Sequence, residues 1–143
     1  MVCTFIGHRD TSMTATLRKQ LQDAIITLIN HGVKLFYVGN NGSFDLLVQD
    51  VLLKVVQSYP SVRFDVVLSA INEKPLIEKD CSTIFPEELE LVPKRFAISK
   101  RNDYMIKHAS FIISYVSHPF SNSIKFIEKA QQRGCTIINL ATN

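Results

Sequence analysis

The sequence has no tryptophan, five glycines and three cysteines among its 143 residues. The cysteines, Cys3, Cys81 and Cys135, are odd in number and form no CxxC pair, which argues against a disulfide framework or a zinc module. No apolar run reaches the roughly 18 residues of a membrane-spanning helix, and the first residues lack the cationic start of a secretory signal. We therefore expect a cytoplasmic protein with reduced thiols and no membrane partner.

The chain is also poor in net charge, which is +3. A balance this mild does not indicate a dedicated nucleic-acid binder, so we expect no nucleic-acid partner. The charges are nevertheless unevenly placed, because residues 73–90 hold six acids and two bases whereas residues 94–108 hold five bases and one acid. This asymmetry indicates a local anion site. A hydrophobic content of 46% with 20% charged residues is typical of a folded globular domain.

Apolar runs and helical patterns alternate along the chain. The expected strands are residues 2–6, 34–38, 62–70, 111–115 and 136–140. Because they are continuously apolar, they are typical of a parallel sheet covered on both faces. We predict one α/β domain over residues 1–143, with a Rossmann-like, doubly wound parallel sheet of about five strands in the order 3-2-1-4-5 and helices on both faces.

Four helices are expected between these strands. Their predicted starts are Thr11 or Ser12, Asp45, Ser99 and Ser121. Residues 71–98 are the irregular part, broken by three prolines, with at most a turn near residues 86–91. A connection of this length is more often functional than idle.

In an open parallel sheet, ligands bind at the carboxyl ends of the strands where the strand order reverses. That point lies here between the first and fourth strands, next to Gly7-His8-Arg9 and to residues 116–122. Gly7 would let backbone N–H groups approach an anion, and Arg9 offers a two-pronged guanidinium for a phosphate or carboxylate. The alternative is a turn glycine followed by two solvated side chains.

The loop after the second strand, residues 39–45, reads GNNGSFD. Its residues tolerate positive φ, so successive N–H groups could form an anion-binding nest at a helix N-terminus. It matches neither GxGxxG nor the P-loop, because no lysine follows. A plain helix-capping loop explains it equally well.

Arg101-Asn102-Asp103 falls in the first turn of the third predicted helix, where the helix dipole disfavours cations. An anion shared with Arg101 would explain this placement. The alternative is partial neutralisation by Asp103 or Asn102. Glu128, in the last predicted helix, is a further candidate for a functional role. The alternative is that it forms an ordinary surface ion pair with Lys125.

The four histidines and three cysteines have no metal-ligand spacing, and no H-E-x-x-H or G-x-S-x-G motif is present. We therefore expect no metal and no cofactor.

Four segments in order resemble the SLOG superfamily, the Rossmann-like group of Smf/DprA and LOG proteins. They are the first strand with Gly7-His8-Arg9, residues 39–45, residues 101–106, and residues 121–128 with the last strand. Over essentially the whole chain, the sequence is most similar to the small YpsA-like proteins. The resemblance implies binding of a nucleotide or a nucleotide-derived, ADP-ribose-like phosphate compound at the strand ends, and it is compatible with a homodimer.

The residues expected to contact the ligand are Gly7, His8, Arg9, Gly39, Gly42, Ser43, Asp45, Arg101, Asn102, Ser121, Asn122 and Ser123. One alternative is a LOG-type phosphoribohydrolase that cleaves the N-glycosidic bond of a nucleoside monophosphate, for which the resemblance implies Arg101 and Glu128 as catalytic residues. A second is a DprA-like DNA-associated scaffold. Ser121 and Asn122 replace the family's glycine pair, which makes backbone approach to a phosphate harder, so we expect binding more than catalysis.

Overall fold

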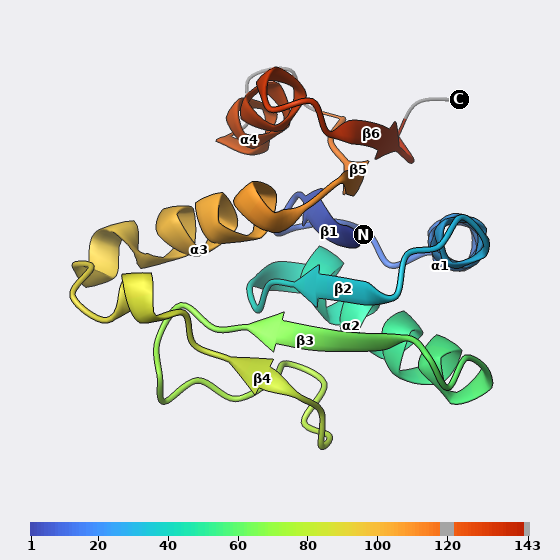
Figure 1. The fold of residues 1–143 in the computed structure, drawn as a ribbon, viewed down its shortest axis with the longest axis horizontal. Coiled ribbons are helices and arrows are strands. Elements are labelled where there is room, and N and C mark those ends of the chain that lie inside the picture. The colour runs from blue at the N-terminus through green and yellow to red at the C-terminus, as the bar shows by residue number, and fades with distance from the viewer. Residues whose placement is uncertain (118–121, 142–143) are drawn as a thin grey trace.

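The computed structural model describes residues 1–117 and 122–141. Within them, six parallel strands form one sheet in the order β4-β3-β2-β1-β5-β6, flanked by four α-helices (Figure 1). The strands are β1 Val2–Gly7, β2 Leu35–Val38, β3 Arg63–Val67, β4 Thr83–Ile84, β5 Phe111–Tyr115 and β6 Thr136–Asn139. The helices are α1 Ala15–Asn30, α2 Gly42–Val55, α3 Lys94–His108 and α4 Asn122–Gln132, with 3₁₀ turns at Val56–Ser58 and Glu87–Leu89.

The predicted fold class is confirmed. The five strands expected from the sequence lie in the predicted order, as β3-β2-β1-β5-β6, and the strand order reverses between β1 and β5. The sheet has a sixth strand, β4, at its edge beside β3. The sequence did not predict β4 because two residues are too few to show a hydrophobic pattern within residues 71–98.

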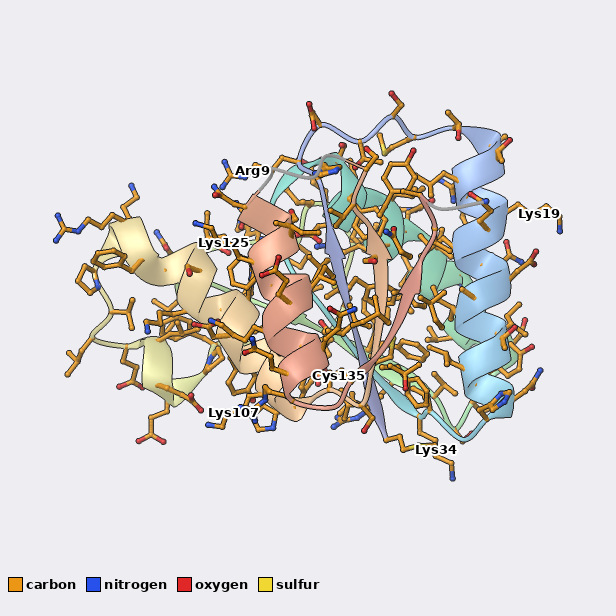
Figure 2. The ribbon with its side chains drawn as sticks, turned by 90° about the horizontal axis from the view of Figure 1, so that it is seen from above. Arg9, Lys19, Lys34, Lys107, Lys125 and Cys135 are labelled. Carbon is orange, nitrogen blue, oxygen red and sulfur yellow. The ribbon has the colours of Figure 1, made fainter. Side chains whose placement is uncertain are left out.

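Helices cover both faces of the sheet. Figure 2 shows α1 on one side of the strands and α3 with α4 on the other. Phe5 and Phe36 point to the α1–α2 side, where their rings stack with centroids 6.0 Å apart inside the larger core cluster. Ile6 and Ile112 point the other way, into a smaller cluster with residues of α3 and α4. Burial on both faces explains why the strands are continuously apolar.

The first helix begins later than predicted. Thr14, and neither Thr11 nor Ser12, is the N-cap of α1, and its hydroxyl oxygen accepts a hydrogen bond from the N–H of Leu17 at 3.0 Å. The Thr11 hydroxyl instead donates to the carbonyl of His8 at 2.7 Å. Thr11 therefore stabilises the loop after β1, a role that a cap-forming residue type can equally fill. The second helix starts at Gly42, ahead of the predicted Asp45.

The third helix begins at Lys94, directly after Pro93, and the predicted start at Ser99 is wrong. Proline fits the start of a helix because the N–H it lacks would have no partner there. Arg101 therefore lies in the middle of α3, and the argument that the helix dipole disfavours it does not apply. A different physical reason must account for the position of this arginine.

Candidate functional site

A cavity of about 760 Å³ opens where the strand order reverses. Its walls come from the end of β1 and the following loop, the start of α2, the first half of α3, and α4 as far as Lys129. The volume suits a small organic ligand. The sequence-predicted residues that line it are Gly7, His8, Arg9, Asp45, Arg101, Asn102, Asn122 and Ser123.

Gly39, Gly42 and Ser43 are not among the lining residues. Gly42 has φ +86°, and a Cβ there would lie 2.6 Å from the Cα of Arg9. The N–H of Ser43 donates to the carbonyl of Arg9 at 2.7 Å, and its hydroxyl lies 2.7 Å from the carbonyl oxygens of both Arg9 and Thr11. These residues hold the loop after β1 against the start of α2, so they shape the cavity from behind its wall.

His8 connects the two loops that flank the reversal point. It is 7% exposed, and its Nε2 accepts a hydrogen bond from the N–H of Ser117 at 2.8 Å. Gly7 has a packing role, because a Cβ at this position would overlap the ring of Phe44. Both residues therefore fix the shape of the cavity mouth.

Arg101 is the most deeply buried charged group of the site, with 2% of its surface exposed. Its Nε donates to Asn102 Oδ1 at 3.0 Å, and its Nη1 donates to the carbonyl of Val67 at 3.4 Å. Burial lowers the pKa of Arg101, and Asp45 and Glu73 oppose that shift while Arg9 adds to it. Within the described residues, no carboxylate oxygen comes within 4.0 Å of its guanidinium.

Asp45 is the buried carboxylate of the cavity, with 9% of its surface exposed. Its Oδ2 accepts a hydrogen bond from the N–H of Asn41 at 2.9 Å. Burial raises the pKa of Asp45 above its ordinary value, and the Arg101 guanidinium, the Asn41 N–H and Arg9 act in the opposite direction.

The charges that line the cavity are mostly positive. Arg9, Arg95, Arg101, Lys125 and Lys129 contribute five cationic groups, against the carboxylates of Asp10 and Asp45. Arg9 and Lys125 lie at the same end of the molecule in Figure 2, opposite Lys34 and Lys107. Clefts lined by one sign of charge attract ligands of the opposite sign. The cavity is therefore suited to an anion.

Sequence reasoning missed Arg95, Lys125 and Lys129 as lining residues. The basic run over residues 94–108 pointed to Arg95, but the late predicted start of α3 hid its position on that helix. Lys125 and Lys129 are four residues apart on α4 and share one face of it. Lys129 also forms an ion pair with Asp103, at 2.6 Å.

Glu128 is exposed and is not among the residues that line the cavity. It follows Ile127, which is buried against the sheet, and the helical rotation turns it away. Ser121 lies outside the described residues.

An amide network holds residues 69–77 beside the site. The side chain of Gln49, fully buried in α2, donates to the carbonyl of Gly39 at 2.8 Å and to Asn40 Oδ1 at 3.0 Å. The N–H of Ile77 donates to Gln49 Oε1 at 3.2 Å, and Asn40 Nδ2 donates to the carbonyl of Lys74 at 2.9 Å. The first part of the irregular segment is thus pinned to the end of β2.

Comparison with known proteins gives no assignment: no family model matches the chain, and no curated protein matches it significantly. In the part of the chain that the structure describes, no cluster of three or more histidine, cysteine or acidic side chains could hold a metal ion. None of the helices described is both long and apolar enough to cross a membrane.

Proposed function

We propose that this chain is a cytosolic, SLOG-like protein of the YpsA type that binds a nucleotide or a nucleotide-derived phosphate compound in the cavity at the carboxyl end of β1. The observation that carries the proposal is the buried Arg101 guanidinium in the wall of a cavity lined mostly by cations. The cavity also lies where ligands bind in open parallel sheets. The segments that resemble the SLOG superfamily contribute much of its wall.

Arg101 supports an anionic ligand through its unused hydrogen-bonding capacity. A guanidinium has five N–H donors, and within the described residues only Nε and Nη1 of Arg101 donate a hydrogen bond. A buried charge without a close partner costs several kcal/mol, about 3–5 when a partner is removed. A phosphate in the cavity would accept hydrogen bonds from the remaining donors and offset that cost.

The hydrolase alternative receives less support from the geometry. Its carboxylate was expected to be Glu128, which is exposed and away from the cavity wall. The DNA-scaffold alternative receives little support from a net charge of +3, which is too small for a dedicated nucleic-acid binder. The arrangement therefore favours ligand binding as the function.

The test is a thermal-unfolding screen with nucleoside mono- and diphosphates, ADP-ribose and phosphorylated sugars. A compound at one hundred times its Kd adds about 2.7 kcal/mol to the free energy of unfolding. We expect at least one compound to raise Tm in the wild type and not in Arg101→Met. The matched control is Arg63→Met, which removes an exposed arginine at the start of β3.

The control variant should respond to the ligand as the wild type does. A folded wild type that no compound stabilises would contradict the proposal. So would a ligand-induced shift of equal size in Arg101→Met.

A further inference from the structure

The cavity has an apolar section in addition to its cations. Among the described residues, the apolar side chains that line it are Phe5, Ile6, Ile98 and Phe126. Phe5 and Ile6 are almost completely buried in the two core clusters, whereas Ile98 of α3 and Phe126 of α4 keep part of their surface exposed. A phosphate group needs no apolar contact surface. These two side chains are therefore not explained by the need to bind an anion.

Ile98 and Phe126 belong to two helices that enclose a wedge. The helices α3 and α4 pack together where Lys129 Nζ and Asp103 Oδ1 lie 2.6 Å apart, and Figure 2 shows them diverging towards their N-terminal ends. At a rise of about 1.5 Å per residue, Phe126 lies about 4.5 Å and Ile98 about 7.5 Å along its own helix from this ion pair. The two apolar side chains therefore line the two sides of the wedge at similar depth.

The cations nearest the outer part of the wedge are engaged with the protein itself. Lys129 pairs with Asp103, and its Nζ lies 5.7 Å from the centroid of the Phe126 ring. Arg95 Cζ lies 4.8 Å from the centroid of the Phe96 ring. The cations left for a phosphate are then those of the following group, which form no ion pair within the described residues: Arg9, Arg101 and Lys125.

The phosphate position and the apolar section are close neighbours. Arg101 follows Ile98 by three residues on α3, which is nearly one turn and about 4.5 Å along the helix axis. Both side chains line the cavity, and Asn102, which lies four residues after Ile98, lines it as well. A single small ligand can therefore contact the guanidinium with one end and the wedge with the other.

The polar groups between the apolar side chains decide which ligand group fits the wedge. Ser99 and Asn102 line the same stretch of α3. The Oδ1 of Asn102 accepts from Arg101 Nε, but its N–H₂ group donates no hydrogen bond within the described residues. A nucleobase has apolar faces that stack on aromatic side chains and a polar edge that can meet such groups. An alkyl chain lacks the polar edge, and a sugar lacks the flat apolar face.

We infer that Ile98 and Phe126 form a base-binding site in the wedge between α3 and α4, so that the ligand must carry a nucleobase as well as a phosphate. This inference rests on the proposed function, because Arg101, which would hold the phosphate, is the residue named there. It goes further by assigning the contribution of the base to two side chains. A phosphorylated sugar without a base then binds only weakly.

The experiment compares AMP, GMP, CMP and UMP with ribose 5-phosphate, which has the same sugar and phosphate but no base. Isothermal titration calorimetry on the full chain measures the affinity for each compound. Stacking of a base on an aromatic side chain predicts that the wild type binds at least one of the nucleotides about 10- to 100-fold more tightly than ribose 5-phosphate. This ratio of affinities is the base preference.

Phe126→Leu keeps an apolar side chain and removes the aromatic face. The base preference should fall about fivefold or more in this variant, while the affinity for ribose 5-phosphate stays unchanged. Phe85→Leu, the same change at a partly buried position outside the cavity wall, is the matched control and should keep the full preference. Ile98→Ser, at a partly exposed position, keeps the inference testable if Phe126→Leu does not fold, and it should lower the preference about threefold or more.

The outcomes separate this inference from the proposed function. If the wild type binds ribose 5-phosphate as tightly as every nucleotide, the base-binding site is overturned and phosphate binding remains intact. A base preference that survives in Ile98→Ser, and in Phe126→Leu where that variant folds, also overturns the site. If none of these compounds binds and no compound of the thermal screen does, both the base-binding site and the proposed function fail.

Discussion

Asp45 and Arg101 approach the same glycine from two different helices. A Cβ on Gly39 would lie 2.7 Å from Asp45 Oδ2 and 3.1 Å from Arg101 Cζ. Asp45 belongs to the first turn of α2 and Arg101 to the middle of α3, so the end of β2 acts as the spacer between a buried acid and a buried base. Position 39 has no room for a side chain, and this lack of space explains why a glycine stands there.

The first prediction concerns Gly39→Ala. The added methyl group would push the carboxylate of Asp45 and the guanidinium of Arg101 out of position, at a cost of about 1–3 kcal/mol in the free energy of unfolding. We also expect ligand affinity to drop at least tenfold. Chemical denaturation and titration calorimetry measure the two effects.

The control for this variant is Gly134→Ala. Gly134 has φ +87° and open space around its Cα, so the alanine should cost about 1 kcal/mol through the backbone alone. Ligand affinity should not change. Equal affinity in Gly39→Ala and the wild type would show that the spacer does not position the site.

The second prediction concerns Gln49→Leu. The change leaves the buried carbonyl of Gly39 and the partly buried N–H of Ile77 without their partner, and we expect a loss of about 2–4 kcal/mol in the free energy of unfolding. Hydrogen exchange at Ile77 should become faster, because residues 69–77 lose one of their anchors. Leu53→Ala, a partly buried position on the same helix, provides a control that destabilises without touching the network. Unchanged exchange at Ile77 would contradict this role.

The third prediction concerns pH and the ion pairs of Asp50. Although partial burial acts to raise it, hydrogen bonds from Arg18 and Lys54 hold the pKa of Asp50 below its ordinary value. A carboxyl whose pKa is lowered by folding adds stability above its unfolded pKa, and that stability is lost as pH falls through the folded pKa. Asp50→Asn should therefore cost about 0.5–1 kcal/mol at pH 7 and almost nothing at pH 2.

The matched control for Asp50 is Asp23→Asn. Asp23 pairs with Lys19 at 3.4 Å, but both side chains are exposed, so this change should be close to neutral at either pH. By contrast, Arg18 Nη1 of α1 and Asp50 Oδ2 of α2 lie 2.7 Å apart. A cost for Asp50→Asn that is equally large at pH 2 would mean that packing, and not charge, accounts for it.

The fourth prediction concerns thiol reactivity. Cys3 is fully buried in β1, and burial strongly raises the pKa of its thiol. Burial raises the pKa values of Cys81 and Cys135 as well, but these two residues are only partly buried. Because the thiolate is the reactive form, a disulfide reagent at pH 8 should modify Cys81 and Cys135 slowly and Cys3 only at the rate of unfolding. Fast native modification of Cys3 would contradict the packing of β1.

Most of the fold could be predicted from the sequence because each of the longer strands is a predominantly apolar run. The predicted helix starts that were wrong are those that depend on single side chains. Thr11 and Ser12 are residue types as suitable for a cap as Thr14, but the Thr11 hydroxyl is used by the carbonyl of His8, three residues earlier, and Thr14 caps the helix. The start of α3 at Lys94, directly after Pro93, was missed because most of the first turn of this helix is exposed and has no apolar periodicity.

The candidate site was predictable in location more than in detail. Arg101 was chosen for a helix-dipole reason that the structure overturns, yet it lies in the cavity wall because the middle of α3 crosses the strand ends. Ser43 was expected to face a ligand, but its N–H donates a hydrogen bond to the carbonyl of Arg9 in a neighbouring loop instead. Whether a turn points its donors at a ligand or at the protein is a tertiary property that no local pattern encodes.

The central claim is that a phosphate compound occupies the cavity at the carboxyl end of β1. The most direct measurement is a ¹H–¹⁵N NMR titration of the labelled protein with the tightest ligand of the screen. Saturable shifts should concentrate at the amides of Gly7, Asn102 and Ser123 and at the Nε–H of Arg101, all of which line the cavity. The amides of Val55 and Tyr59, in the groove beside α1 and α2, should stay unchanged. Shifts confined to that groove, or no shifts at saturating ligand, would contradict the account.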